Sequence, residues 1–174
     1  TPNMAALFLT CNRNKRSVVL HLKQKSGRSA LFKLAETADV VLHNSRPGVM
    51  AKLGLDYPDF KAVNPKLIYC AAQGYGKKGP YGNRGALDDA IQSASGMASL
   101  TISATDEPRC LPMAMADKNT ALTTVYAIMG ALFHRERTGE GQELEVAMFE
   151  NMVHFTMLEH LWGRTFEPPI GTTN

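Results

Sequence analysis

Two repeating patterns of apolar positions divide the chain into segments. Short apolar runs rich in β-branched residues predict β-strands, and they occupy residues 16–22, 39–43, 66–73 and 142–148. Between the first three runs, apolar residues at helical spacing predict one helix after Ser26, reaching Ala38, and a second over 57–63 that Asp56 can cap. The first half of the chain therefore has the order strand, helix, strand, helix, strand.

This alternation of strands and helices predicts the α/β class. Strands that are apolar on both faces indicate a parallel sheet covered by helices on both sides, with right-handed crossovers between the strands. Ligands of such sheets bind at the carboxyl ends of the strands. We therefore expect a ligand at that edge.

The second half of the chain is mostly helical. Helical spacing predicts helices over 88–95, 118–138 and 148–162, with a glycine-rich loop over 74–86 and a polar connector over 101–112. Gly139 ends the longest helix, and after Gly163 the periodicity is lost. We expect the long helix to be buried on at least one side, through an apolar stripe of Leu122, Val125, Tyr126, Met129, Leu132 and Phe133.

Composition narrows the functional classes. The chain has 174 residues, 44% of them hydrophobic and 20% charged, which is typical of a globular domain, and no apolar run approaches the length of a membrane span. A net charge of +3 with only short basic clusters does not favour nucleic acid, and an anionic small ligand would suffice as a partner. Cys11, Cys70 and Cys110 form no C-x-x-C motif, which disfavours a disulfide framework and a zinc site and favours a cytoplasmic location.

Several local motifs have weak support. The string "GYGKKG" matches G-x-G-x-x-G, but Gly79 is followed by Pro80 and further loop residues instead of a helix, which disfavours a dinucleotide site. The basic run "NRNKR" fits a solvated strand edge or a phosphate site, and its spacing favours the solvated edge. The histidines form no H-E-x-x-H motif, and the sequence contains no G-x-S-x-G elbow.

Asp117 stands at the predicted start of the long helix. Aspartate is a favoured N-cap, worth about 1 kcal/mol, because its oxygen accepts hydrogen bonds from amides of the first turn. The same donors and the helix dipole would keep the carboxylate ionised, which is the state that a carboxylate nucleophile needs. The two roles are compatible, and local physics leaves the choice open.

A series of sequence blocks resembles the class III coenzyme A transferases, the CaiB/BaiF family that includes formyl-CoA transferase and carnitine-CoA transferase. The blocks are "NRNKRSVVLHLK", "ADVVLHNSRPGVMAKLGLDY", "NPKLIYCAAQGYGKKGP", "DDAIQSASGM", "MADKNTAL", "ALFHRERTGEGQELEVAMFE" and "FEPP". They occur in the order and spacing of that family and cover nearly the whole chain. Such a series is far more specific than any single motif above.

The resemblance implies an enzyme that moves CoA between an acyl-CoA and a carboxylic acid, with these small molecules as substrates and no metal. The family's aspartate, matched by Asp117, forms a mixed anhydride and then an aspartyl-CoA thioester. A racemase branch of the family uses a histidine for proton transfer, and Leu87 occupies that place here. A transferase is therefore favoured over an α-methylacyl-CoA racemase.

Further positions match the family's contacts to CoA: Leu20, Lys23, Asn44, Ser45, Lys52, Leu53, Asp88 and Met148. Ser45 replaces the phenylalanine or similar large residue that is usual there. Leu87 and Gly85 stand where formyl-CoA transferase has a tyrosine and a lysine. These two differences disfavour an oxalate or formyl substrate.

The resemblance also implies a Rossmann-like parallel sheet flanked by helices. Family members are much longer, so we expect residues 1–163 to be part of the large domain and 164–174 to begin the interdomain linker. The family's first strand, small domain and carboxyl-terminal return are expected to be missing, and with them most activity of these 174 residues alone. The family's interlocked homodimer is also implied, although this stretch could not close the ring. A non-catalytic remnant that binds CoA or dimerises is the alternative.

Overall fold

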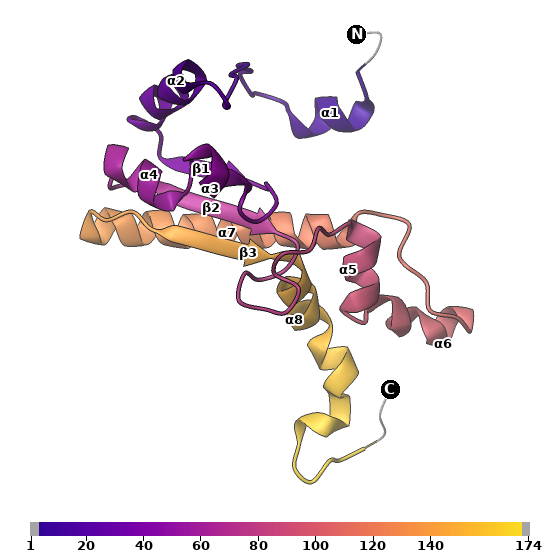
Figure 1. The fold of residues 1–174 in the computed structure, drawn as a ribbon. Helices are drawn as coiled ribbons and strands as arrows, with labels where there is room; N and C mark the ends of the chain where they lie inside the picture. Colours follow the sequence, from indigo (N-terminus) through magenta and orange to yellow (C-terminus); the bar gives the residue numbers. More distant parts are fainter. Residues whose placement is uncertain (1–3, 172–174) are drawn as a thin grey trace.

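The molecule is built around a parallel sheet of three strands. A computed structural model describes residues 4–171, apart from the side chain of Ser103. The strands are β1 (Val40–His43), β2 (Ile68–Gln73) and β3 (Glu143–Ala147), and they lie in the order β1-β2-β3 with both neighbouring pairs parallel (Figure 1). The α/β class and three of the four predicted strands are confirmed.

Helices make up most of the remaining structure. In chain order they are α1 (Ala6–Cys11), α2 (Lys25–Ala35), α3 (Val49–Leu53), α4 (Tyr57–Val63), α5 (Asp88–Ala94), the 3-10 helix η1 (Met97–Thr101), α6 (Ile102–Thr105), α7 (Met115–Thr138), α8 (Met148–Leu161) and the 3-10 helix η2 (Trp162–Thr165). None of the helices in residues 4–171 combines the length and the apolar character needed to cross a bilayer.

One face of the sheet packs against α2 and α4. Phe60 of α4 and Tyr69 of β2 are fully buried, with ring centroids 5.6 Å apart, and Leu55 and Leu67 complete the cluster. The Tyr69 hydroxyl donates a hydrogen bond to the Leu55 carbonyl (3.1 Å). Helix α4 begins as predicted, because Asp56 and Asp59 form a capping box at its amino terminus.

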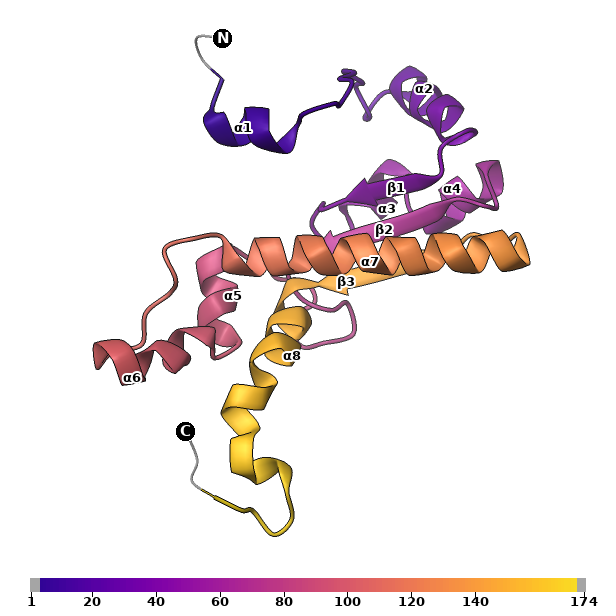
Figure 2. The same cartoon turned by 180° about the vertical axis from the view of Figure 1, so that it is seen from behind.

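Helix α7 runs along the other face of the sheet, over β2 and β3 (Figure 2). The side chains that α7 buries are small, namely Ala116, Thr120, Thr124 and Ala131. Their spacing of about four residues places them on one side of the helix. Small side chains let the helix backbone lie close to the strands, so this side, and not the large apolar stripe, faces the sheet.

The predicted orientation of the apolar stripe on α7 is therefore wrong. Leu122, Tyr126, Met129 and Phe133 are all more than 60% exposed. These residues lie on the side of α7 away from the sheet. The helix is nevertheless buried on one side, as expected, through its small residues.

The predicted strand over residues 16–22 is also wrong. No strand precedes β1 within residues 4–39, and Val19 is 94% exposed. A strand needs a neighbour for its backbone hydrogen bonds, and the sheet contains only β1, β2 and β3. Leu20, inside the predicted strand, and Lys23, directly after it, lie in an irregular segment before α2 instead.

The helices differ from the predictions in three places. Helix α2 ends at Ala35 instead of Ala38. The connector over residues 101–112 is not fully irregular, since it contains the short helix α6. Helix α7 begins at Met115 instead of residue 118, and it ends at Gly139, whose φ of 79° suits glycine. The earlier start places Asp117 inside the first turn of α7.

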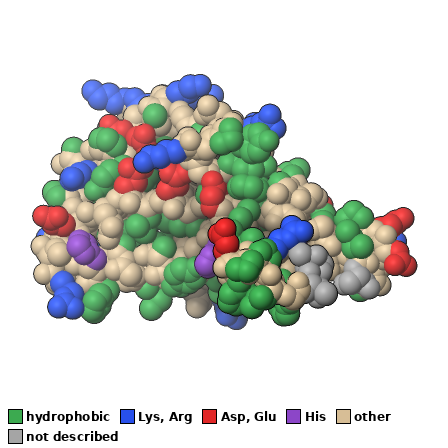
Figure 3. All heavy atoms as spheres, turned by 90° about the horizontal axis from the view of Figure 1, so that it is seen from below, with side chains coloured by type: hydrophobic (Ala, Val, Ile, Leu, Met, Phe, Trp, Pro, Cys, Tyr) green, Lys and Arg blue, Asp and Glu red, His purple; other side chains and the backbone are tan. Residues whose placement is uncertain are grey.

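The end of the chain extends away from the sheet. Helix α8 leads into η2, and exposed apolar side chains gather on this end of the molecule, as Figure 3 shows from below. They include Leu158, Trp162, Phe166 and Ile170, which line a shallow cavity there. The expected linker over 164–174 stays a prediction, and its last three residues lie outside the described residues.

Candidate functional site at the carboxyl edge of the sheet

Two cavities meet where the strands end. The first, called here the polar cavity, has a volume of about 480 Å³, and its lining includes Ser45, Arg46, Gln73 and Arg84. The second, the apolar cavity, has a volume of about 510 Å³ and lies between β1 and α7, with Leu42, Val125 and Ile128 in its wall. Both cavities are lined by Asn44, Ala72, Asp117 and Met148. Both cavities thus lie at the edge of the sheet where the sequence predicted a ligand.

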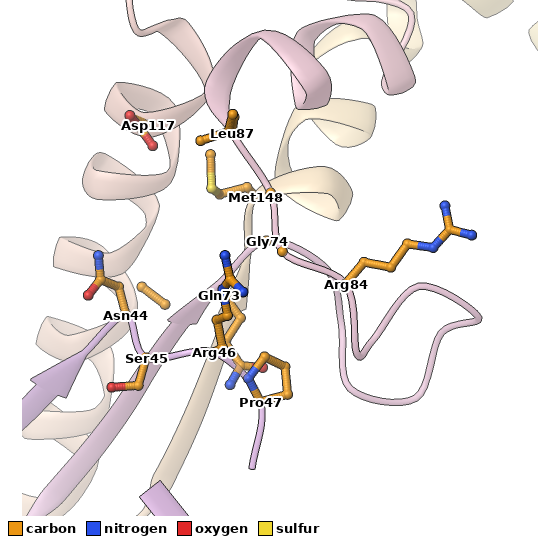
Figure 4. A pocket seen from close by; sticks show the side chains of 13 residues that line it. Asn44, Ser45, Arg46, Pro47, Gln73, Gly74, Arg84, Leu87, Asp117 and Met148 are labelled. Atoms are coloured by element: carbon orange, nitrogen blue, oxygen red, sulfur yellow. The ribbon is translucent and has the colours of Figure 1, made fainter. Parts of the chain in front are cut away.

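Asp117 lies where the two cavities join. It is the third residue of α7, and Ala114 occupies the N-cap position. Its carboxylate accepts no hydrogen bond from residues 4–171, so the interpretation of Asp117 as a helix cap is wrong. Figure 4 shows its side chain at one side of the polar cavity, across from Asn44 and Ser45.

Asp88 performs the capping role that the sequence suggested for Asp117. The Asp117 backbone N–H donates to Asp88 Oδ2 (2.8 Å), and Gln92 Nε2 donates to Asp88 Oδ1 (2.6 Å). Asp88 is the first residue of α5, so one carboxylate joins the start of α5 to the start of α7. This contact fixes the position of the Asp117 backbone.

The environment of Asp117 raises the pKa of its carboxyl group. The largest cause is partial burial, which disfavours the charged form, and the negative charge of Asp88 adds to it. The expectation that backbone donors hold Asp117 in the ionised form is therefore wrong. A raised pKa makes a carboxylate more basic, and an ion with few hydrogen bonds is a better nucleophile than a fully solvated one.

Hydrogen bonds and an ion pair to glutamates hold the glycine-rich loop that borders the polar cavity. The Gly76 N–H donates to both carboxylate oxygens of Glu150 (3.0 and 3.2 Å), and the Lys77 N–H donates to Glu145. The Lys77 ammonium pairs with Glu143 (3.0 Å). A Cβ at position 76 would lie 2.6 Å from the Glu150 carboxylate, so a larger residue there would displace the Glu150 side chain from this contact. No helix begins between the end of β2 and Asp88, in agreement with the weak dinucleotide motif.

The structure brings together some of the predicted site residues. Four of them line the polar cavity: Asn44, Ser45, Asp117 and Met148. Asp88 accepts a hydrogen bond from the Asp117 backbone N–H. The remaining predicted CoA contacts line neither cavity: Leu20, Lys23, Lys52 and Leu53. Leu53 packs against the buried cluster around Tyr69, and Lys52 is exposed on α3.

Sequence reasoning missed three polar residues of the polar cavity. They are Arg46 in the turn after β1, Gln73 at the end of β2, and Arg84 in the glycine-rich loop. The signal for Gln73 was available, because a polar residue ending an otherwise apolar strand lies at the ligand edge of a parallel sheet. Arg84 stacks on Tyr81, with its Cζ atom 4.5 Å from the ring centroid.

Metal and thiol chemistry find little support in this part of the chain. Residues 4–171 contain no group of three or more His, Cys, Asp or Glu side chains placed to hold a metal ion. Cys70 is fully buried in β2, and burial raises the pKa of its thiol, which fits a structural cysteine. Asp117 is thus the candidate reactive group of the two cavities.

Comparison with known proteins identifies the family of this chain. The family described as CoA-transferase family III matches residues 1–174. The chain belongs to this family. Members of CoA-transferase family III act on CoA thioesters and carboxylic acids, so the resemblance drawn from the sequence blocks is confirmed.

Individual relatives give the extent of the match. A succinate–glutarate CoA-transferase from Agrobacterium fabrum is 40% identical over 146 residues, which cover 84% of this chain and 36% of the relative. A formyl-CoA:oxalate CoA-transferase from Escherichia coli is 34% identical over 148 residues, with 84% and 36% coverage. The crystal structure of a CaiB/BaiF family protein from Brucella suis has a TM-score of 0.88 and 39% identity, covering 94% of this chain and 43% of that one. The chain thus spans well under half the length of these CoA-transferase relatives.

Proposed function

We propose that this chain carries the acyl-accepting aspartate of an acyl-CoA:carboxylate CoA-transferase, and that Asp117 is that residue. The observation that carries the proposal is the Asp117 carboxylate, which lies at the junction of a polar and an apolar cavity without a hydrogen-bond partner in residues 4–171. A residue that serves only the fold would be expected to use its carboxylate in a structural contact. Asp88 does so a short distance away, and Asp117 does not.

The first half of the reaction transfers the acyl group. An Asp117 carboxylate oxygen attacks the carbonyl carbon of the thioester, a C–O bond forms, and the C–S bond breaks. CoA leaves as its thiolate, and the product is a mixed anhydride between Asp117 and the acyl group. The raised pKa of Asp117 favours this attack, because a more basic carboxylate is the stronger nucleophile.

The second half moves CoA to the acceptor. The thiolate attacks the Asp117 carbonyl of the anhydride, which releases the donor acid as a carboxylate and leaves an aspartyl-CoA thioester. The acceptor carboxylate then attacks this thioester, and the same two steps in reverse order give the new acyl-CoA and free Asp117. Both cavities open onto Asp117, so one can hold the sulfur side of the thioester and the other the acyl side.

The alternatives have less support. A racemase needs a group that moves a proton, and Leu87, which occupies that place beside Asp117 in the polar cavity, is an aliphatic residue with 77% exposure. A non-catalytic remnant would have no reason to keep an unpaired carboxylate at the junction of two cavities. The CoA contacts proposed for Leu20, Lys23, Lys52 and Leu53 lie outside both cavities and would meet more distant parts of CoA.

The test is a trapping experiment on the full-length protein. The protein is incubated with pentanoyl-CoA, quenched, and examined by peptide mass spectrometry for a CoA adduct on the peptide that contains "MADKNTAL". Hydroxylamine should remove the adduct and leave a hydroxamate on Asp117. Asp117→Asn should form no adduct and lose turnover by at least about 10³-fold, since an amide cannot form the anhydride.

The matched control is Asp89→Asn. Asp89 is exposed, and its side chain makes no hydrogen bond in the described structure, so the control should keep both adduct and turnover. Because the Asp117 carboxylate also makes no hydrogen bond, Asp117→Asn should unfold at nearly the wild-type urea concentration. An Asp117→Asn protein with wild-type turnover would refute the proposed nucleophile.

A further inference from the structure

Two polar groups of the polar cavity have no partner. Gln73 is only 6% exposed, and its Oε1 atom is buried without a hydrogen bond. The Arg46 guanidinium forms neither a hydrogen bond nor an ion pair with any residue in 4–171. A buried amide normally finds a partner, because an unmade hydrogen bond leaves the cost of desolvation uncompensated. Arg46 is an exposed residue, so its guanidinium is open to a ligand.

The fold places these two groups at one site. Gln73 is the last residue of β2, and Arg46 lies three residues after the end of β1, so both come from the carboxyl ends of neighbouring parallel strands. They line the same cavity as Asp117. The only carboxylate in that lining is Asp117 itself.

Arg46 is better placed than Arg84 to serve a ligand. The Arg84 side chain stacks on Tyr81, and Figure 4 shows it directed away from Asp117. The Arg46 guanidinium instead packs against the backbone at Gly85, about 3.6 Å from where a Cβ would stand. Because Gly85 has no side chain, no group from that position covers the guanidinium.

We infer that Arg46 and Gln73 bind the second carboxylate of a dicarboxylic substrate whose first carboxyl group reacts at Asp117. This inference rests on the proposed function. A planar guanidinium binds a carboxylate through two parallel hydrogen bonds. A half-turn of the Gln73 amide exchanges its oxygen and its NH₂ group, so this side chain can donate to the same carboxylate.

The size of the cavity favours a carboxylate over a phosphate of CoA. Asp117 and Arg46 border one cavity of about 480 Å³, so one ligand in this cavity can contact both. In CoA the phosphates are separated from the sulfur by the whole pantetheine arm. An anion that lies close to the reacting carbonyl therefore belongs to the acyl group or the acceptor acid.

The test compares two thioesters of equal chain length with the full-length protein. Glutaryl-CoA carries a second carboxylate, and pentanoyl-CoA does not. The rate of adduct formation on Asp117 should be at least about 10-fold higher with glutaryl-CoA, as expected for a hydrogen-bonded charged group. Arg46→Met should reduce this ratio to near one. The matched control Arg137→Met removes an arginine at the far end of α7 and should keep the ratio.

A second variant separates binding from folding. Gln73→Met replaces the unpartnered amide by an apolar chain of similar length, so it should reduce the glutaryl-to-pentanoyl ratio while moving the urea midpoint of the free protein upward. A merely structural role for Gln73 predicts the opposite shift of the midpoint.

The outcomes distinguish this inference from the proposed function. Adducts from both thioesters with a ratio that Arg46→Met does not change would overturn the carboxylate subsite and leave the nucleophile intact. An equal fall of both rates in Arg46→Met would assign Arg46 to a part of CoA common to both thioesters, which also overturns it. The absence of any adduct in the wild-type protein would overturn the nucleophile and, with it, this inference.

Discussion

Asp88 connects the stability of the site to its acidity, and replacing it tests both. Its carboxylate accepts one hydrogen bond from the Asp117 N–H (2.8 Å) and one from the Gln92 amide (2.6 Å). It also lies in the first turn of α5, where a negative charge interacts favourably with the helix dipole. The same charge contributes to the raised pKa of Asp117.

The expected loss of stability follows from these contacts. A hydrogen bond to a charged group contributes about 1.5–3 kcal/mol and a neutral one about 1 kcal/mol. Asp88→Asn keeps one acceptor oxygen and should reduce the free energy of unfolding by about 1–2 kcal/mol. Asp88→Ala removes both acceptors, but Gln92 keeps bonds to the Leu111 and Met113 carbonyls, so the expected loss is about 2–3 kcal/mol.

The effect of Asp88→Asn on pH dependence has a definite sign. Removing the Asp88 charge removes one of the two causes that raise the pKa of Asp117, so this pKa should fall. The proposed nucleophile must be ionised, and activity is therefore lost as the pH falls through the pKa of Asp117. The acid limb of the pH–rate profile should move to lower pH in Asp88→Asn.

The assays are urea unfolding and the pH dependence of adduct formation, both on the full-length protein. Asp89→Asn removes the neighbouring exposed charge on the same helix and should change neither measurement by a comparable amount. An acid limb that Asp88→Asn left in place would refute the effect of Asp88 on the pKa of Asp117. An Asp88→Ala protein as stable as Asp89→Asn would refute the role of Asp88 in stability.

Two further substitutions test how α2 and α4 are joined to the sheet. Tyr69→Phe leaves the buried Leu55 carbonyl without its hydrogen bond and should cost about 1–2 kcal/mol in urea unfolding, and an unchanged midpoint would contradict the buried bond. Asn64 donates to the Ala35 and Ala38 carbonyls (3.0 Å each) and accepts from the Lys66 N–H. Asn64→Ala should therefore reduce the free energy of unfolding by about 2–3 kcal/mol. The control Lys61→Ala, on the exposed surface of α4, should reduce it much less.

Helix boundaries that are set by residues close together in the sequence were predictable from it. The start of α4 follows from Asp56 and Asp59, whose spacing allows each side chain to cap the other's backbone amide. The end of α7 follows from Gly139. In both cases the residues that determine the boundary are adjacent in the sequence.

Elements that depend on distant partners were not predictable in the same way. Residues 16–22 have the composition of a strand, but strand formation requires a neighbour that the described sheet does not provide. The stripe on α7 was assigned to the core because large apolar residues usually face inward. Close packing on the sheet selected the small residues Thr120 and Thr124 instead.

The candidate site shows the same division. Asn44, Ser45 and Met148 were matched to CoA contacts through the family resemblance, and all three lie just after a strand end, at the ligand edge. The missing partners of Arg46 and Gln73 could not be inferred, because a residue's pairing depends on every segment around it. The exchange of roles between Asp117 and Asp88 likewise depends on the packing of α5 against α7.

The anchoring of the glycine-rich loop has a consequence for the order in which the molecule assembles. Gly76 is held by Glu150, which lies 74 residues later in the chain, and Lys77 by glutamates on β3. The cluster around Phe60 and Tyr69, by contrast, is formed entirely by residues 22–69. Contacts between distant segments carry a larger loop-closure cost and form later than local ones. The hydrophobic cluster should therefore assemble first, and the wall of the polar cavity only after β3 has joined the sheet and α8 has followed it.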